Sequence, residues 1–475
     1  MTFNSVPFVV FFALVFPAYW LLHGRKRQNL LLLVASYVFY GWWDPRFLLL
    51  LAGTTLVDFF AVQQIETAGD DESRRRKWMI FSVAINLSVL GFFKYFGFFA
   101  SSFAAMLRHV GMNASYDTLH FLLPVGISFY VFHEISYAVD VYRRRTTAEH
   151  DLVTYAVYIA FFPQLVAGPI TRASHMLPQF RRERKFPNGD QLYSGSVLIL
   201  SGLFKKVVLA DSMAAIVNQT FSNPKGRGAL PLIVGALAFS IQIYGDFAGY
   251  TDIARGVARL LGIDIPRNFE QPYLSRNITE FWRTWHISLS SWLHDYLYVP
   301  LGGNRDGRWK TYRNLMITML LGGLWHGAAW TFVIWGAMHG IALCLHRAFG
   351  KPVPRGRPGM PTADDILAIV GTFTLVTALW VFFRAGSFSD ALHYFGAMGD
   401  GLVGRHAGAW KSQFVLVFLV GMTMLAIDLV DRRRITHNPL TMSPMWMQGA
   451  LAGSAVVALI IWSGQAPTPF IYFRF

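Results

Sequence analysis

The stretch LGGLWHGAAW, Leu321–Trp330, places one histidine between glycines inside a long apolar run. It belongs to an almost uncharged region, Asn314–Leu345, that is longer than the roughly 20 residues a helix needs to cross a bilayer. Gly322–Gly323 and Gly327 predict a break near its middle, with His326 at the join. Irregular backbone at membrane depth lines a cavity or is buried in protein, and an ionisable residue there is a functional candidate. His326 is therefore the first candidate, although a neutral histidine bonded to a carbonyl would also fit.

The composition excludes an ordinary soluble domain of this length. Of the 475 residues, 54% are hydrophobic and only 15% are charged. About a dozen hydrophobic segments satisfy a ~20-residue criterion for membrane spans. Clear examples are Val6–Leu22, Arg46–Ile65, Met79–Phe99, Leu230–Ile243, Ile366–Phe383, Phe414–Leu429 and Met447–Trp462. We expect an all-α, polytopic membrane protein, a single integral-membrane domain over residues 1–475 with about 11–13 helical segments.

The basic residues are distributed along the chain as in a membrane protein. The net charge is +15, and no soluble basic module that could bind nucleic acid is visible. Basic residues cluster in short loops, where they set the topology and meet anionic lipid head groups. The clusters are Gly24–Arg27, Ser73–Lys77, Arg143–Arg145 and Asp431–Arg434. If they are cytoplasmic, both termini lie outside and the number of full spans is even.

The residues that could carry chemistry are few. Cys344 is the single cysteine, so the chain can form no internal disulfide, and the sequence predicts no metal site. It also lacks a G-x-S-x-G elbow, a P-loop and an H-E-x-x-H motif. What remains is one or two membrane histidines among tryptophans, since His339 could equally be a packing histidine. Neutral imidazole is a general base near neutral pH, which allows acyl transfer or proton-coupled transport.

The region Asn277–Gly303 is too polar to span a membrane alone. Its large apolar residues recur at three- and four-residue steps and predict one helical stripe. The stripe comprises Trp282, Trp285, Leu289, Trp292 and Tyr296, whereas Arg283, His286, Ser290, His294 and Asp295 lie off it. We expect a re-entrant helix packed inside the bundle, or an ordinary interfacial helix with an aromatic belt.

Intramembrane acids provide the main alternative from another class. Asp246 lies in or beside a span and, with Glu134 and His326, could carry protons in a transporter. Asp252 and Arg255 are three residues apart and can pair on one helix face. The chain has no internal repeat, which argues against a two-halved transporter.

Several motifs together resemble the membrane-bound O-acyltransferases, most closely the bacterial branch that acetylates alginate. The resemblance covers most of the chain and rests on Tyr40–Leu51, Leu123–Phe132, Phe161–Arg172, Tyr244–Gly256, FWRTWHISLSSWLHDYLYVPLGGNR (Phe281–Arg305) and RNLMITMLLGGLWHGAAWTFVIWGAMHG (Arg313–Gly340). It implies a bundle with re-entrant helices around a central tunnel. His326 would be the active-site histidine, and His286 a second histidine facing the tunnel. The implied tunnel or substrate residues are Trp282, Trp285, Trp325, Asp295, Asn304 and Asp246.

Two positions depart from the family pattern. His133 stands where a glutamine or similar residue is common, and His294 stands where arginine is frequent. Both flank the motifs, so acceptor or partner selectivity could differ without a change in the core chemistry.

The last nine residues, PTPFIYFRF (Pro467–Phe475), form a short apolar tail that we expect outside the cytoplasm. It resembles tails in this branch whose tyrosine is proposed to pass an acyl group to an extracytoplasmic transferase. Tyr472 is therefore the candidate acyl relay, with His326 as its base. Alternatively, the aromatic residues anchor the C-terminus at the membrane interface.

The resemblance implies an acetyltransferase of the bacterial inner membrane, with both termini periplasmic and no bound cofactor. The donor would be acetyl-CoA, and the acceptor an exported polysaccharide such as alginate, reached directly or through a periplasmic SGNH-type acetyltransferase partner. Peptidoglycan or cellulose acetylation stays open, as do protein or lipid acylation and the transporter. Membrane lipids, but no nucleic acid, are the remaining expected partners.

Overall fold

The computed structural model describes residues 1–112, 124–351, 360–432, 444–462 and 470–471, and every regular element in these ranges is helical. The contacts divide the chain into two compact units. Unit 1 comprises Met1–Gly195 and Val257–Pro266, and unit 2 comprises Ser196–Gly256 and Arg267–Phe475. Helices α10 and α12 each belong partly to both. The single domain expected from the sequence stays a prediction.

Seven helical segments in the described chain are long and apolar enough to cross a membrane. They are Arg46–Thr67, Glu72–His109, Ala229–Leu260, Trp330–Phe349, Ala363–Arg384, Trp410–Asp431 and Met445–Trp462, and Val6–Leu21 is a shorter apolar helix. This confirms an all-α, polytopic membrane protein. Seven is fewer than the dozen hydrophobic segments of the sequence, in part because the apolar stretches between residues 127 and 165 form three helices too short to count as spans.

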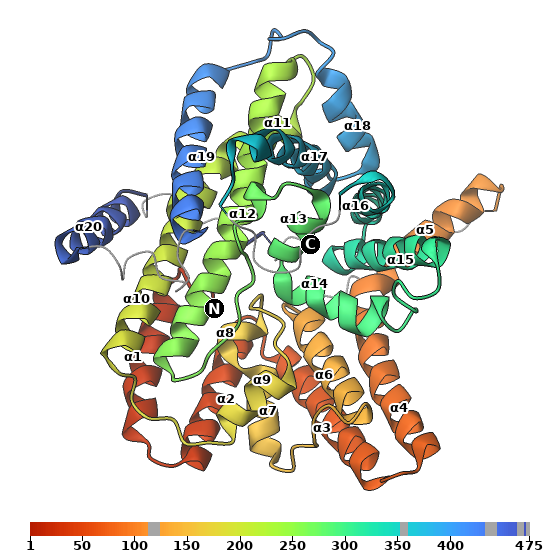
Figure 1. The fold of residues 1–475 in the computed structure, drawn as a ribbon, viewed down its shortest axis with the longest axis vertical. Coiled ribbons are helices and arrows are strands. Elements are labelled where there is room, and N and C mark those ends of the chain that lie inside the picture. Colours follow the sequence, from red (N-terminus) through yellow and green to blue (C-terminus); the bar gives the residue numbers. More distant parts are fainter. Residues whose placement is uncertain (113–123, 352–359, 433–443, 463–469, 472–475) are drawn as a thin grey trace. The chain divides into compact units, whose positions relative to one another are not determined.

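Unit 1 contains the helices coloured red to yellow in Figure 1. They are α1 (Val6–Leu21), α2 (Arg25–Gly41), α3 (Arg46–Thr67), α4 (Glu72–Leu90), η1 (Gly91–Tyr95), α5 (Phe96–His109), α6 (Ile127–Tyr142), α7 (Leu152–Ala160), α8 (Phe162–Leu165), α9 (Ala173–Phe180) and the start of α10 (Gly189–Leu203). Side-chain oxygens of Ser5, Asp71 and Asp151 accept hydrogen bonds from the first turns of α1, α4 and α7. These caps explain where three of the helices begin.

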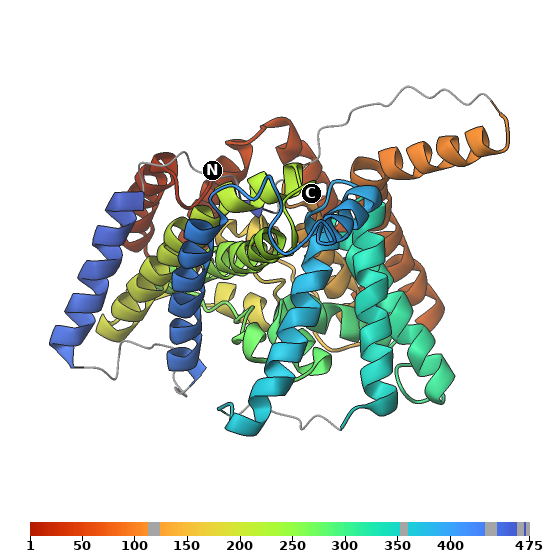
Figure 2. The same cartoon turned by 90° about the horizontal axis from the view of Figure 1, so that it is seen from above.

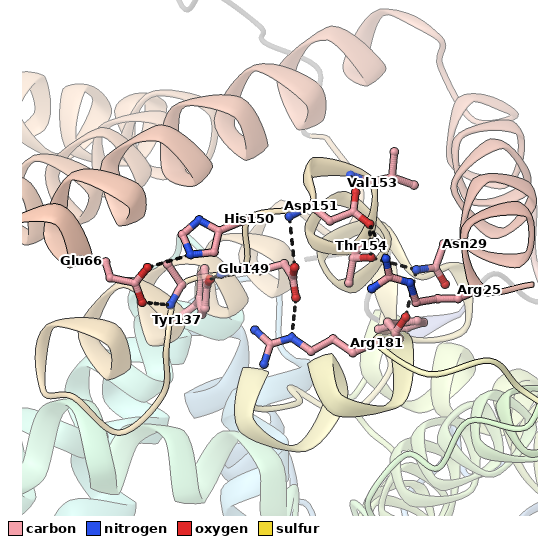
Figure 3. A network of polar contacts seen from close by, with 12 residues as sticks. Arg25, Asn29, Glu66, Tyr137, Glu149, His150, Asp151, Val153, Thr154 and Arg181 are labelled. Atoms are coloured by element: carbon pink, nitrogen blue, oxygen red, sulfur yellow. Dashed lines mark hydrogen bonds and ion pairs between the residues drawn. The ribbon is translucent and has the colours of Figure 1, made fainter.

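A polar network joins several helices of unit 1 (Figure 3). The Glu149 carboxylate accepts a hydrogen bond from Arg181 Nε at 2.6 Å, and the Glu149 backbone N–H donates to Tyr137 Oη at 2.6 Å. Asn29 Nδ2 donates to Thr154 Oγ1 at 3.0 Å and ties α2 to α7. Such a network fixes the mutual register of helices whose apolar faces alone would allow sliding.

Unit 2 is built around α12 (Ala229–Leu260), a helix of 32 residues. Of its most apolar stretch of 18 residues, 83% are buried. The other elements are the end of α10, η2 (Phe204–Ala210), η3 (Asp211–Met213), α11 (Ala214–Ser222), η4 (Pro272–Leu274), α13 (Ile278–Thr284), α14 (Ile287–Leu293), η5 (His294–Tyr298), α15 (Arg308–His326), α16 (Trp330–Phe349), η6 (Ala363–Asp365), α17 (Ile366–Arg384), α18 (Phe388–Ala397), α19 (Trp410–Arg432) and α20 (Met445–Trp462). In Figure 2, α16 and α17 run side by side.

The uncharged run around His326 forms two complete helices that pack against each other. The break lies at 327–329, directly after His326. The prediction that His326 lies where the two helices join is therefore confirmed. The expected break at Gly322–Gly323 is wrong, because α15 continues through both glycines. A Cβ on Gly323 would lie 2.2 Å from Phe332 O, and one on Gly336 would lie 2.3 Å from Met319 O. The glycines therefore permit close helix packing.

The single helix expected over Asn277–Gly303 is also wrong. The chain forms α13, α14 and the π-helical η5, and it breaks between α13 and α14 at Trp285 and His286. His286 has φ 45° and ψ 54°, a left-handed conformation that an α-helix does not contain. His286 therefore occupies a kink and not the polar face of a continuous helix.

Candidate active site

His326 ends α15 in buried aromatic surroundings. Its exposed fraction is 4%. The His326 ring centroid lies 5.2 Å from that of Trp335 with perpendicular planes, 5.3 Å from Phe383 and 5.0 Å from its neighbour Trp325. Trp325 belongs to α15, Trp335 to α16 and Phe383 to α17. The close packing of α15 on α16 therefore places the imidazole among these rings. Such surroundings shield the imidazole from bulk water.

His286 lies beside His326, with the two ring centroids 6.3 Å apart. His286 is fully buried, and its ring also contacts Phe247, at 4.6 Å, and Trp325, at 5.8 Å. Neither His286 ring nitrogen has a hydrogen-bond partner among the described residues. Buried polar groups are nearly always paired, so a pair of unpaired nitrogens marks a place for a polar ligand or water. The structure thus brings together the two histidines that the sequence singled out.

A loop from Asn268 to Glu270 holds the kink in place. Ile287 N donates to Asn268 O at 2.9 Å, and the N–H of Ser288 donates to Asn268 Oδ1 at 3.1 Å. Glu270 N donates to Thr284 O at 2.9 Å on the other side of the kink. These bonds satisfy backbone groups that a helix break would otherwise leave unpaired. This role of Asn268 was not predicted from the sequence.

Burial, not a charged partner, sets the protonation of His286. Desolvation lowers the pKa of His286 to about 3, because the charged form cannot be hydrated inside the protein. The imidazole is therefore neutral near pH 7 and can accept a proton or donate a hydrogen bond, depending on its tautomer.

His339 is closer to this group than the sequence suggested. It is fully buried on α16, its ring centroid lies 4.7 Å from that of Trp335, and its Nδ1 accepts a hydrogen bond from Trp282 Nε1 at 3.3 Å. Trp335 thus contacts both His326 and His339. In the described chain, Trp335 Nε1 and His339 Nε2 have no hydrogen-bond partner. His339 joins the candidate site as a further polar group.

The predicted tryptophans fall into the same aromatic cluster. Trp285 is 1% exposed and contacts Trp380 at a centroid distance of 5.0 Å, and Trp380 stacks on Trp335 at 5.5 Å. Trp325 is buried between both histidines. Trp380 and Phe383 come from α17, and the sequence did not identify them because an apolar span gives no indication of which face meets the site.

Two predicted site residues lie in and after η5 and are more exposed than the buried histidines. Asp295 lies in η5, half-exposed, and pairs with His294 Nδ1 at 2.9 Å. Asn304 is exposed in the turn that follows. The family resemblance implied both residues. Their assignment as tunnel or substrate residues stays a prediction.

Asp246 is buried on α12, next to Phe247. Its Oδ1 lies 2.5 Å from Lys206 Nζ, and its Oδ2 accepts a hydrogen bond from the backbone N–H of Ile471 at 2.7 Å. The predicted relay Tyr472 follows Ile471 in the chain and lies outside the described residues. Phe470 and Ile471 themselves are buried, with exposed fractions of 3% and 6%.

The other acids raised by the transport alternative have local partners. The predicted pairing of Arg255 with Asp252 is confirmed at 3.4 Å, and Lys205 approaches Asp252 at 2.7 Å. Glu134 is buried in unit 1, where Thr55 Oγ1 donates to its Oε1 at 3.3 Å. His133, also in unit 1, accepts a hydrogen bond at Nε2 from Thr171 N at 3.0 Å. The ion pairs of Asp246 and Asp252 account for both acids without a transport role.

A cavity of about 590 Å³ in unit 2 borders the loop that holds His286. Asn268, Phe269 and Tyr244 line it, together with apolar residues of α10, α19 and α20. Its charged part includes Arg267, paired with Asp431 at 2.9 Å. The cavity is therefore largely apolar with charge on one wall, a character suited to an amphiphilic molecule.

Comparison with known proteins adds the chemical class. Residues 141–370 match the model of the membrane-bound O-acyltransferase family. The chain is 39% identical to "Probable alginate O-acetylase AlgI" of Pseudomonas putida over the whole of both chains. It is 44% identical to the protein of the same name in Pseudomonas aeruginosa, covering 84% of this chain and 75% of that one. It is 36% identical to the peptidoglycan O-acetyltransferase of Helicobacter pylori, covering 82% and 78%.

Proposed function

Because the chain belongs to the membrane-bound O-acyltransferase family and is an O-acyltransferase, we propose that it moves an acetyl group from acetyl-CoA across the bacterial inner membrane for O-acetylation of an exported polysaccharide. Alginate is the first candidate acceptor, supported by the names of relatives about 40% identical to it. Peptidoglycan is the second, supported by the Helicobacter pylori relative. Cellulose remains a third.

The observation that carries the proposal is the buried pair His286 and His326. Two imidazoles 6.3 Å apart in an aromatic enclosure, one with both nitrogens unpartnered in the described chain, can serve one reacting group between them. The pair consists of two imidazoles, whereas a Ser-His-Asp arrangement relies on a serine nucleophile. The residues instead suit direct attack by a hydroxyl on an already activated acyl group.

The proposed step is a proton-coupled acyl transfer. Neutral His326 accepts the proton of a hydroxyl as its oxygen bonds to the thioester carbonyl carbon. The carbon–sulfur bond breaks, and the CoA thiolate leaves and takes up the proton from the imidazolium. His286 orients the donor or the acceptor, and the enclosure of tryptophans keeps out water that would hydrolyse the thioester.

The hydroxyl in the first transfer is proposed to be that of Tyr472. A phenol oxygen is nucleophilic once deprotonated, and a phenyl ester keeps acyl-transfer potential. The burial of Phe470 and Ile471 supports this assignment, since Ile471 directly precedes Tyr472 and belongs to the unit that holds both histidines. A periplasmic SGNH-type transferase would then pass the acetyl group to the polymer.

The proposal is tested in a bacterium whose own copy of the gene is deleted. The O-acetyl content of its exported polysaccharides is measured after complementation with wild type, His326→Ala or His393→Ala, the last being an exposed histidine of the same unit. We expect wild type and His393→Ala to restore acetylation and His326→Ala to reduce it by roughly 10²–10⁴-fold, the usual contribution of a general base. Normal acetylation by a well-expressed His326→Ala protein would refute the proposal.

A further inference from the structure

The buried carboxylate of Asp246 binds a backbone N–H near the C-terminus of the chain. Asp246 Oδ2 accepts the N–H of Ile471 at 2.7 Å, while its Oδ1 pairs with Lys206 Nζ at 2.5 Å. Lys206 is shared with Asp211, whose Oδ1 lies 2.9 Å from the same nitrogen. We call Asp246, Lys206 and Asp211 the tail clamp. All three belong to unit 2, and Asp246 is only 2% exposed.

Aromatic packing places the tail beside the clamp. The Phe470 ring centroid lies 4.7 Å from that of Tyr250 and 5.9 Å from that of Phe247, on successive turns of α12. Phe247 also contacts His286, at 4.6 Å. One turn of α12 therefore carries the carboxylate that holds the tail and a ring that touches both the tail and a candidate active-site histidine.

The clamp contains more than charge neutralisation requires. A buried aspartate needs a cation or hydrogen-bond donors, and Lys206 alone could supply this need. Lys206 lies beside Oδ1 of Asp246, however, and the other oxygen, Oδ2, accepts an N–H from the tail. A charged acceptor makes this hydrogen bond stronger than one between neutral groups. Because the bond goes to the backbone, it fixes the position of the chain whatever side chain residue 471 carries.

We propose that Asp246, oriented by Lys206, is a positioning residue that anchors the C-terminal segment through the Ile471 N–H, and that acetyl transfer to the next residue, Tyr472, depends on this anchor. The anchoring itself is independent of the chemistry. The dependence of transfer on the anchor, which we call presentation, rests on the proposed function, in which Tyr472 receives the acetyl group. Asp246 then acts on transfer through the tail and does not contact the reacting atoms.

The anchoring is tested by hydrogen–deuterium exchange of the C-terminal peptide in the purified full-length protein. Asp246→Leu removes the acceptor, and we expect the peptide's amides to exchange about tenfold faster or more, the factor for losing one hydrogen bond to a charged group. The matched control is Asp252→Asn on the same helix, which pairs with Lys205 and Arg255 and not with the tail. Unchanged exchange in folded Asp246→Leu, or an equal rise in Asp252→Asn, would overturn the anchoring.

A second variant removes the donor and leaves the ion pairs intact. Ile471→Pro has no backbone N–H, whereas Ile471→Val keeps it. We expect Ile471→Pro to speed exchange at the flanking residues as Asp246→Leu does, with Ile471→Val unchanged. The double variant Asp246→Leu/Ile471→Pro should be no worse than either single change, because both break one bond. Additive effects would contradict a shared role. This variant also decides the question if Asp246→Leu does not fold.

Presentation is tested by transfer kinetics in the same variants with acetyl-CoA as donor. We expect kcat for acetyl transfer to the chain to fall tenfold or more, with KM for acetyl-CoA within about twofold of wild type, since the donor site is intact. Faster tail exchange with unchanged kcat would overturn the presentation while leaving the anchor. If wild type itself transfers nothing, the proposed function fails, and the exchange contrast still decides the anchor.

Discussion

His286 is a single residue whose backbone conformation determines where its ring lies. A non-glycine residue in the left-handed region costs on the order of 1–3 kcal/mol and persists only where its surroundings hold it. Here the bonds to Asn268 on the α14 side and the fully buried ring hold it. The consequence of the strained backbone is the position of the ring, because the kink turns the imidazole toward Phe247 and His326.

Substitution at His286 should separate stability from activity. Both His286→Gly and His286→Asn tolerate the left-handed conformation, but both lose the imidazole. The relief of backbone strain offsets part of the free energy lost with the buried ring, so we expect unfolding temperatures to fall only slightly. Acetyl transfer should fall by at least about tenfold, the effect of one lost hydrogen bond in the transition state. Thermal unfolding monitored by tryptophan fluorescence and a thioester-consumption assay provide the two measurements. Equal loss of stability and activity would assign His286 a purely structural role.

The sequence predicted the site residues unevenly, for physical reasons. His326 follows from elementary chemistry, because an ionisable group in a long uncharged run needs an explanation. His286 needed the family motif, since the apolar stripe runs through the kink as if the helix were continuous. Asn268 and Trp380 were missed because their roles depend on contacts made far along the chain.

At the scale of elements, the hairpin of α15 and α16 is the framework of the site. Its glycines let the two helices approach until backbone meets backbone, and this approach places Trp335 against His326. The sequence showed the glycines but not their use. Glycine in an apolar helix is equally compatible with a break and with a close contact, and only the partner helix decides between them.

Gly323→Ala tests this packing. The added methyl group would lie 2.2 Å from Phe332 O and 3.1 Å from Gly336 Cα, so backbone must shift. We expect destabilisation of at least about 1–3 kcal/mol, as in other overpacked interiors. Gly371→Ala in α17, where a Cβ meets nothing within 4 Å, should be neutral or stabilising by up to roughly 1 kcal/mol. Fluorescence-detected size-exclusion after heating ranks the variants, and equal unfolding temperatures would contradict the close-contact account.

For the whole molecule, hydrophobicity predicted the class of fold, and the structure confirms it with seven candidate spans in the described chain. The sequence contains about a dozen hydrophobic segments against these seven spans. Apolar composition does not separate a spanning helix from short helices buried inside the protein, as α7 and α8 show. The division into two units could not be predicted from the composition, because helices α10 and α12 each continue from one unit into the other.

The distribution of basic residues predicts the topology, with both termini outside and Ser73–Lys77, at the start of α4, in the cytoplasm. Single cysteines at Thr2 and Ser73, each introduced with Cys344→Ser, report the side of the membrane. A membrane-impermeant maleimide should label the Thr2→Cys protein in intact cells, and the Ser73→Cys protein only after the cells are opened. Labelling of Ser73→Cys in intact cells would reverse the predicted orientation.

The most direct measurement is transfer of label from radiolabelled acetyl-CoA by purified wild type, His326→Ala and Tyr472→Phe proteins of equal stability. The account predicts that wild type consumes the thioester and becomes labelled on the chain, that His326→Ala loses both by roughly 10²–10⁴-fold, and that Tyr472→Phe loses the label on the chain. Thioester consumption and labelling by His326→Ala at the wild-type rate would contradict the account.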